Sequence, residues 1–276
     1  KNLPIVSKEY VLSAYQGSFR VEFSDDFSTT RYSSGRVAFN PNNYSVFVDS
    51  HIYELGVGEF RIPDVLSTSS DESKLPNAQV SQGFASLMDR TDTGVKDNIN
   101  RIGGMDMIDG NLVIQGYEFY DALGDAKQTT VVVRDPENLT ASEVDGFYQM
   151  EGGARTVNYL SPIPHEWQAI LGGRYLAGNG GGMPIVTRNS EGPSIYVFDP
   201  IALAETNWEV PMKVWMNYPA AEHALSTEVV QGNYPDWAGW DVVNDTGAND
   251  LWTEESAAAF GFIIPGTRTF MAVGSS

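Results

Sequence analysis

The chain alternates between short runs of β-branched or aromatic residues and clusters of turn-forming residues, with little helical periodicity. The clearest pattern lies in residues 35–66. Three successive strands are predicted there, at Val37–Asn40, Ser45–Asp49 and Gly58–Ile62. Residues of these types favour strands because their side chains pack well on a pleated surface. The turn formers at 41–43 separate the first two runs, so the pattern predicts a small antiparallel sheet.

Similar units recur at intervals of roughly 70–80 residues, which is a period typical of repeat architectures. We place the unit cores at 35–66, 103–139, 180–203 and 259–276. The strands predicted in the later units are Met105–Ile108, Asn111–Gln115, Thr129–Arg134, Met183–Thr187, Ser194–Phe198, Phe260–Ile264 and Thr269–Val273. In the second unit Asp109-Gly110 separates two apolar runs, which is a strong signal for a tight hairpin.

The segments between these units carry weaker patterns. We predict strands at Tyr10–Tyr15, Ser18–Phe23 and Met212–Asn217. A helix is predicted at His165–Leu171, and one or two helical turns at Gln82–Asp89. The remaining residues of these segments are interpreted as long loops, and the segment 140–181 as a whole is predicted to be a long connection.

Repeated strand triplets without the helical periods of a βαβ chain favour an all-β fold, a β-propeller-like array of blades with long inter-blade loops. The third strands share an ending in which Asp adjoins Pro, as in EFRIPD, VVVRDP and IYVFDP. A β-sandwich is the alternative, although it does not require recurring triplets. With its Asn-Pro-Asn-Asn run at 40–43 and Phe-Asp-Pro run at 198–200, the chain resembles β-propeller proteins, including exported bacterial ones. Residues 1–276 are expected to form one such domain or part of one.

The last unit contains only two predicted strands, so the last blade is incomplete within this chain. An open strand edge invites pairing with another chain, and something is expected to cover it. In one interpretation, Tyr10–Tyr15 and Ser18–Phe23 return to complete this blade. In the other, which we favour, the missing strands lie beyond residue 276 or on another chain.

The charge balance narrows the possible partners. The chain has 17 basic and 36 acidic residues, for a net charge of −19. Nucleic acid and anionic membranes are therefore unfavourable partners, because phosphate binding requires clustered basic side chains.

Other compositional features bear on chemistry and location. Because the chain contains no cysteine, disulfides, thiolate metal sites and cysteine nucleophiles are excluded. No apolar run approaches the length of a membrane helix. Residues 1–14 lack the basic and then apolar pattern of a leader peptide. The acidic, loop-rich β composition favours an exported protein, extracellular or periplasmic.

Catalytic candidates are sparse. His51 follows a predicted strand, between Asp49 and Glu54, where a base and carboxylates would serve proton abstraction. A lyase acting on a uronate sugar would combine His51, Tyr117 and Arg188, provided that the fold brings them together. A solvated polar turn explains His51 equally well, so we favour a binding protein over an enzyme.

Aromatic and acidic residues in the last long connection form a candidate ligand platform. Trp237 and Trp240 are flanked by Asp236 and Asp241, a composition typical of surfaces that stack on sugar rings. Hydrophobic anchoring of a large loop is the alternative reading of these tryptophans.

Two acid-rich loops provide candidate calcium ligands. Their oxygen-bearing side chains are Asp89, Asp92, Asp97, Asn244, Asp245 and Asp250. Neither loop has the glutamate that closes an EF-hand loop. A structural Ca²⁺ and a solvated turn both remain consistent with these sequences.

Together these patterns predict an exported binding protein that recognises a glycan or a protein through its loop face. The first alternative is an extracellular carbohydrate-active enzyme, a polysaccharide lyase or a glycoside hydrolase. The second alternative is a structural subunit of a surface assembly, in which another chain completes the last blade.

Overall fold

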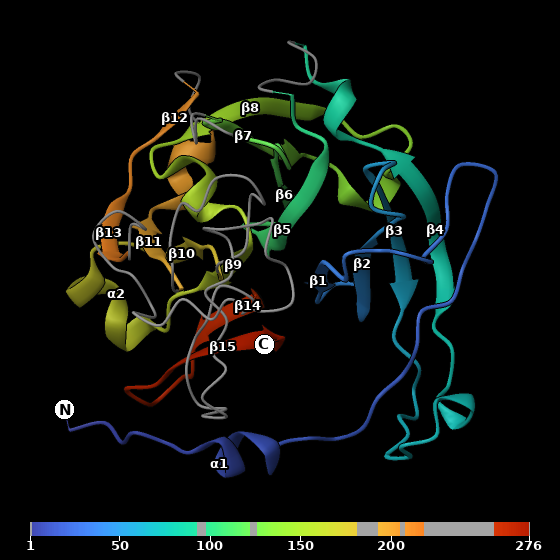
Figure 1. Ribbon diagram of the computed structural model, residues 1–276, viewed down its shortest axis with the longest axis horizontal. Coiled ribbons are helices and arrows are strands. Elements are labelled where there is room, and N and C mark those ends of the chain that lie inside the picture. The colour runs from blue at the N-terminus through green and yellow to red at the C-terminus, as the bar shows by residue number, and fades with distance from the viewer. Residues whose placement is uncertain are drawn as a thin grey trace, which may run out of the picture.

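The computed structural model describes residues 2–92, 98–121, 126–180, 193–204, 208–217 and 257–275 (Figure 1). The fold is predominantly β, as predicted, and none of its sheets closes on itself. The helices and 3-10 turns of the described residues are α1 Lys8–Leu12, η1 Glu72–Lys74, η2 Met88–Arg90, η3 Pro136–Asn138, η4 Gly153–Thr156, α2 His165–Leu171 and η5 Pro200–Ala204.

The strands form three larger sheets and one hairpin. In chain order they are β1 Val37–Asn40, β2 Ser45–Asp49, β3 Gly56–Arg61, β4 Gln79–Ser86, β5 Arg101–Ile108, β6 Asn111–Tyr117, β7 Gln128–Val133, β8 Val144–Met150, β9 Tyr159–Pro162, β10 Tyr175–Gly178, β11 Ile195–Phe198, β12 Glu209–Val210, β13 Lys213–Met216, β14 Ala257–Ile263 and β15 Phe270–Ser275. Most of them are short and joined directly to the preceding strand, which favours antiparallel pairing.

The sheets follow the order of the chain. The first has the order β1-β2-β3-β4, and the second β5-β6-β7-β8 with β12 added in parallel beside β8. The third has the order β9-β10-β11-β13, and β14 pairs with β15 in a hairpin. Neighbouring strands within β1–β4, within β5–β8, within the third sheet and within the hairpin are antiparallel. The strands β1–β4 and β5–β8 thus form simple meanders, and the third sheet is a meander whose last connection includes β12.

The first strands of successive sheets lie against one another. β1 contacts β5, β5 contacts β9, and β9 contacts β14. Figure 1 shows these four strands gathered near the middle of the view, with β4, β8 and β13 toward the outside. The molecule therefore has a central region built from four strand segments that are far apart in the sequence.

The hydrophobic core lies between successive sheets. One cluster joins the first sheet, through Phe47 and Val57, to the second, through Leu112 and Val131. A second cluster joins the second and third sheets, and another packs Ile263 of β14 on the third sheet. Because β2 is buried at all five positions, the sheet is covered on both faces, which explains its continuous apolar sequence.

The Asp-Pro pairs end the third strands of the second and third sheets. Proline lacks an N–H group and fixes its own φ, so it stops a ladder and starts a 3-10 turn. Pro136 begins η3 two residues after Arg134, and Pro200 begins η5 directly after Asp199. Both turns reach the preceding sheet. Gln82 Nε2 of β4 donates to the Pro136 carbonyl at 2.7 Å, and Arg134 Nη2 donates to the Leu203 carbonyl at 2.8 Å.

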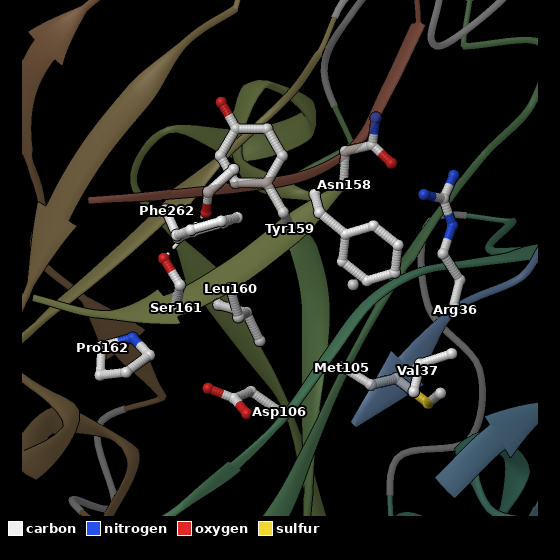
Figure 2. Close-up of a pocket in the computed structure, with 13 residues that line it drawn as sticks. Arg36, Val37, Met105, Asp106, Asn158, Tyr159, Leu160, Ser161, Pro162 and Phe262 are labelled. Carbon is white, nitrogen blue, oxygen red and sulfur yellow. Dashed lines mark hydrogen bonds between the residues drawn. The ribbon is translucent and has the colours of Figure 1, made fainter. Parts of the chain in front are cut away.

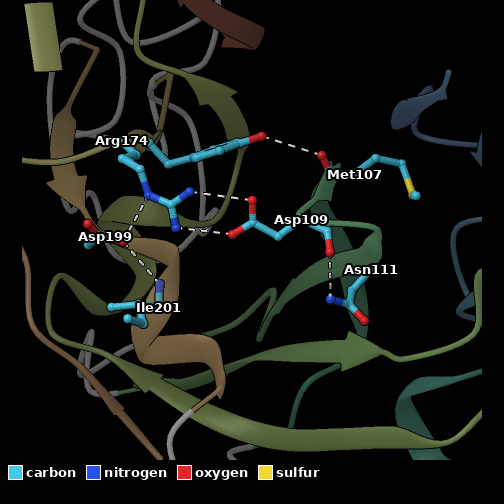
Figure 3. Close-up of polar contacts among 7 residues, drawn as sticks. Met107, Asp109, Asn111, Arg174, Asp199 and Ile201 are labelled. Carbon is cyan, nitrogen blue, oxygen red and sulfur yellow. Dashed lines mark hydrogen bonds and ion pairs between the residues drawn. The ribbon is translucent and has the colours of Figure 1, made fainter. Parts of the chain in front are cut away.

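Polar contacts also join the third sheet to both of its neighbours. Trp167 Nε1 of α2 donates to the Thr267 carbonyl in the β14–β15 turn at 2.8 Å. Arg174 bonds Asp109, in the β5–β6 turn, at 3.0 Å and Asp199 at 3.1 Å (Figure 3). The Arg174 contacts are half-exposed, so each contributes at most about 1 kcal/mol. Their main effect is on alignment, because they hold the third sheet in a fixed position beside the second.

Several sequence predictions are confirmed. The structure has strands at or within two residues of the predicted bounds for β1, β2, β3, β6, β7, β11, β13 and β15. The Asp109-Gly110 turn is present, with positive φ at both residues. The helix predicted at His165–Leu171 is α2, with the same bounds, and Gly172 ends it in the left-handed conformation.

Other predictions are wrong. Tyr10–Tyr15 is not a strand, because Lys8–Leu12 forms α1, and Ser18–Phe23 makes only isolated bridges at Ser18 and Arg20. Gln82–Ser86 is not helical, because β4 continues to Ser86 and pairs with β3; within the predicted helical stretch only Met88 and Asp89 are helical, as part of the 3-10 turn η2. Tertiary pairing overrides local pattern in that segment, since the free edge of β3 supplies the hydrogen bonds that a helix would have supplied internally.

The connection predicted at 140–181 is also wrong, because it contains β8, β9 and β10. The third sheet therefore begins at Tyr159, well before the predicted unit core at 180–203. The predicted strand Met183–Thr187 lies outside the described residues. The sequence signal of these strands is weak, because Asp145 and Gly146 interrupt β8, and β9 and β10 are only four residues long.

The N-terminal segment does not complete the last sheet. Ser18 bonds Ser67 and Arg20 bonds Pro76, so this part of the chain runs along loops of the first sheet. Closer to the N-terminus, Val6 N–H donates to Thr269 Oγ1 at 3.0 Å, at the turn of the hairpin. Among the described residues, β14 and β15 pair only with each other. The interpretation in which Tyr10–Phe23 pairs with the hairpin is therefore wrong.

Candidate functional site

One end of the first two sheets presents a continuous set of aromatic side chains. We call it the loop face, and it comprises residues 32–36, 50–55, 98–101 and 117–121. At this end β1 and β5 begin, while β2 and β6 end. Side chains from both sheets therefore meet there although they are far apart in the sequence.

Six residues form what we call the aromatic strip, each in contact with the next. They are Tyr32, His51, Tyr53, Arg101, Phe119 and Tyr120.

The spacings along the strip are those of direct ring contact. The His51 ring centroid lies 5.7 Å from that of Tyr32 and 5.5 Å from that of Tyr53. Arg101 Cζ lies 4.4 Å from the Tyr53 centroid and 4.9 Å from the Phe119 centroid. The Phe119 and Tyr120 centroids are 4.9 Å apart. Tyr32, Tyr53 and Tyr120 are 80%, 70% and 63% exposed, so the strip is open to a ligand.

Local hydrogen bonds hold the first part of the strip. The buried Asp49 carboxylate accepts bonds from Ser33 Oγ at 2.6 Å, Ser34 N–H at 3.0 Å and Arg36 N–H at 2.8 Å. These bonds fix the segment that follows Tyr32, whose own φ is 59°. Asp49 is thus a positioning carboxylate that orients the strip.

The second part of the strip is held by Arg101. Its side chain is buried, and Nη1 donates to the Asn100 carbonyl at 2.7 Å. A guanidinium between two aromatic rings is attracted by the negative ring faces. This arrangement places a fixed positive charge in the middle of the exposed aromatic surface.

Further buried ionisable side chains lie between Arg101 and the interior of the molecule. Burial raises the pKa of the Tyr117 hydroxyl, the charges of Arg36 and Arg101 lower it, and Asp49 raises it, with a net increase. Burial lowers the pKa of Arg36, while Tyr117 and Asp49 act in the opposite direction. Tyr117 is therefore a neutral hydroxyl between two arginines at neutral pH.

The structure brings two of the three catalytic candidates to one face. His51 lies in the strip, and Tyr117 lies beneath it beside Arg101. Arg188 lies outside the described residues. Of the carboxylates near His51, Asp49 is bonded to the loop at 33–36, and Glu54 accepts a hydrogen bond from Ser28. These carboxylates are engaged in holding loops.

A second feature is a cavity of about 250 Å³ between the four first strands, which we call the central cavity (Figure 2). Its lining residues are Arg36, Val37, Gly104, Met105, Asp106, Asn158, Tyr159, Leu160, Ser161, Pro162, Phe260, Gly261 and Phe262. They come from β1, β5, β9 and β14 and the residues that precede β1 and β9. The lining is mostly apolar, with a cationic and an acidic side chain among its polar groups.

Two polar side chains of the cavity are bonded to backbone. Tyr159 Oη donates to the Ser194 carbonyl at 2.6 Å, and Ser161 Oγ donates to the Gly261 carbonyl at 2.8 Å. Burial raises the pKa of the Tyr159 hydroxyl, which stays neutral.

Asp106 has a different environment. One of its carboxyl oxygens accepts the Met107 N–H at 2.9 Å, and none of the ion pairs of the described residues includes it. Burial raises its pKa to about 7, opposed by the Met107 hydrogen bond.

The predicted calcium ligands are only partly described. Asp89 accepts a hydrogen bond from Ser86 Oγ at 2.7 Å, and Asp92 is exposed. Asp97, Asn244, Asp245 and Asp250 lie outside the described residues. In the described part of the chain, no three His, Cys, Asp or Glu side chains are grouped as a metal site would require.

The predicted ligand platform also lies outside the described residues, with Trp237, Trp240, Asp236 and Asp241 all in the segment 218–256. No helix that the structure describes has the length and apolar character to cross a membrane. Comparison of the chain with models of protein families, with curated proteins and with solved structures finds no match.

Sequence reasoning missed most of the aromatic strip. It selected His51 for its imidazole, but Tyr32, Tyr53 and the adjacent pair Phe119 and Tyr120 lie in polar loops. A usable signal was that these aromatic residues lie within about five residues of predicted strands, at the same end of the units. The central cavity had no signal at all, because its residues come from four separate strands.

Proposed function

We propose that the protein is an exported glycan-binding protein, that its sheets form a propeller-like radial array, and that the aromatic strip is its binding surface. The radial array is supported by the meander topology and by the contacts between successive first strands. The observation that carries the function is the exposed strip, which runs unbroken from Tyr32 to Tyr120.

Stacking on sugar rings is the chemistry that this surface supports best. One face of a hexose ring is largely C–H and packs on an aromatic ring, while the hydroxyl groups at its edge need hydrogen-bond partners. Tyr53 offers an exposed ring, and His51 and Tyr32 offer polar atoms next to it. Aromatic side chains with a polar tip suit such mixed surfaces because each presents an apolar body and a hydrogen-bonding group.

Charge favours a neutral glycan over a uronate or a sulfated sugar. The chain has a net charge of −19, which repels anionic polymers at long range. Arg101 is the cation of the strip, and its guanidinium is already placed against two rings. Its role in the proposal is to fix the rings and to donate hydrogen bonds to hydroxyl oxygens.

A protein partner is the competing ligand, because Tyr and Arg also dominate protein–protein hot spots. The experiment is a glycan array probed with the labelled protein, followed by calorimetry on the best neutral oligosaccharide. We expect Tyr53→Ala to weaken binding about 10-fold or more, the loss of one stacked aromatic ring.

The matched control is Tyr44→Ala. Tyr44 is 53% exposed and lies on the same sheet, in the β1–β2 turn at the opposite end. Its replacement is expected to leave glycan affinity unchanged. An array with no neutral glycan above background, or equal losses from both variants, would contradict the proposal and direct attention to a protein ligand.

A further inference from the structure

The central cavity has a charge pattern that the glycan proposal does not use. Its walls combine the apolar side chains of Val37, Leu160 and Met105 with the aromatic residues Phe260 and Phe262. Its volume is about 250 Å³. A space of this size and lining suits a small organic molecule.

The carboxyl group of Asp106 is the group without a counter-charge in this cavity. One of its oxygens accepts the adjacent Met107 N–H, which leaves the other carboxyl oxygen for another donor. Figure 2 shows the carboxyl on the side of the cavity lined by Ser161 and Pro162, away from Arg36. The Arg36 charge is coupled to Asp49 and Tyr117. With its pKa raised to about 7, Asp106 is partly ionised at neutral pH, and its ionised form gives this side of the cavity a negative charge.

We propose that the central cavity binds a small organic ammonium ion, with the Asp106 carboxylate as its counter-ion and the phenyl rings of β14 around its apolar body. A positive nitrogen gains both from an ion pair in a partly desolvated site and from the negative faces of aromatic rings. The site is separate from the aromatic strip, and it does not depend on the glycan proposal.

The lining disfavours two other ligand classes. A divalent metal ion needs several oxygen ligands, but Asp106 is the one carboxylate among the lining residues. An anionic ligand would meet Asp106 in a confined apolar space, where like charges repel strongly. An ammonium group with a body of about benzyl size satisfies both the charge and the walls.

The experiment titrates the full chain with benzylamine and with benzyl alcohol, which has nearly the same shape and no charge. Calorimetry or ligand-observed NMR is expected to give a dissociation constant on the order of 1 mM for benzylamine. The affinity for benzyl alcohol is expected to be lower than that for benzylamine by a factor of about 10 or more. This comparison uses the unmodified protein, so it does not depend on the folding of a variant.

Variants then locate the site. Asp106→Asn keeps the shape of the side chain and removes its charge, and it is expected to weaken benzylamine about 10- to 100-fold. Tyr53→Ala, in the strip, and Asp64→Asn, on the surface, are expected to change nothing. Equal binding of the amine and the alcohol, an unchanged affinity in Asp106→Asn, or a loss in Tyr53→Ala would overturn the proposal.

Discussion

The substitution Glu59→Gln tests the polar network that joins the first sheet to the second. Glu59, on β3, is 1% exposed. Its carboxylate accepts hydrogen bonds from Asn40 Nδ2 at 2.9 Å, Asn43 Nδ2 at 3.2 Å, Ser45 Oγ at 2.5 Å and Gln82 Nε2 at 2.6 Å. All four partners are donors, so the network is built for an ionised carboxylate.

Glutamine cannot satisfy this set of donors. Its amide has one oxygen, which accepts hydrogen bonds, and one NH₂ group, which does not. In either orientation the NH₂ group would face a donor, which is Gln82 on one side and the remaining donors on the other. Gln82 cannot turn its own amide to compensate, because it also donates to the Pro136 carbonyl and accepts the Leu139 N–H at 2.7 Å. The variant therefore loses at least one charge-assisted hydrogen bond within the first sheet, and with it part of the support for Gln82, whose bonds to Pro136 and Leu139 join the two sheets.

The expected cost is about 2 kcal/mol in the free energy of unfolding. A hydrogen bond to a charged group contributes about 1.5–3 kcal/mol, and a neutral one about 1 kcal/mol. The loss of one bond and the weakening of the others are partly offset, because a neutral amide costs less to bury than a carboxylate. For a chain of this length the change corresponds to a decrease of about 4 °C in Tm.

The effect should depend on pH in a defined direction. Burial raises the pKa of Glu59. The hydrogen bonds from Ser45, Gln82, Asn43 and Asn40 together have the larger, opposite effect, so the pKa lies below its ordinary value. A lowered carboxyl pKa stabilises the fold above the unfolded value of about 4.3 and loses that contribution as the pH falls through the folded value. The difference in unfolding free energy between wild type and Glu59→Gln should thus be largest at pH 7 and should decrease below about pH 4.

Two measurements check this expectation. Urea unfolding followed by tryptophan fluorescence gives the stability at pH 7 and in acid. Hydrogen exchange at residues 136–142 reports whether the contact with the second sheet has loosened. Glu143→Gln, at an exposed position, makes the same charge change and should have little effect. If Glu59→Gln matches wild type in both measurements, the network does not join the sheets.

Two further stability predictions concern the central region. The pKa of Asp106 is raised to about 7, so the folded state keeps a proton that the unfolded chain loses near pH 4. The contribution of Asp106 to stability therefore falls as the pH rises from about 4 to 7, by up to about 4 kcal/mol. Asp106→Asn should flatten that part of a pH–Tm profile, and profiles that run parallel for the variant and the wild type would refute the assignment. Gly103→Ala would place a Cβ 1.7 Å from the Val157 carbonyl oxygen, so β5 must move from β9 at a cost of about 3 kcal/mol or more in urea unfolding. Gly83→Ala, whose Cβ would meet only an Asp25 carboxylate oxygen at 2.9 Å, is the control, and equal losses in the two variants would contradict a backbone clash.

Local pattern was sufficient for part of this fold. The strands β1 and β2 and the helix α2 have the predicted bounds, and the Asp109-Gly110 turn is where the sequence places it. Each of these elements carries its own signal, either an unbroken β-branched run between turn formers or a turn that needs positive φ. The Asp-Pro endings of the third strands were likewise visible, because proline limits its own backbone wherever it occurs.

The third sheet and the candidate sites were decided by the tertiary structure. β4 was mistaken for helix and β8, β9 and β10 for a connection, because their residues become strands only when a neighbouring edge supplies hydrogen bonds. The aromatic strip and the central cavity each combine residues from separate sheets, and no local pattern records which strand ends will meet. The sequence by itself determined where the chain extends and turns, since those choices depend on a few neighbouring residues. Only the packing of sheet on sheet decided which side chains share a surface, since that depends on contacts between residues far apart in the chain.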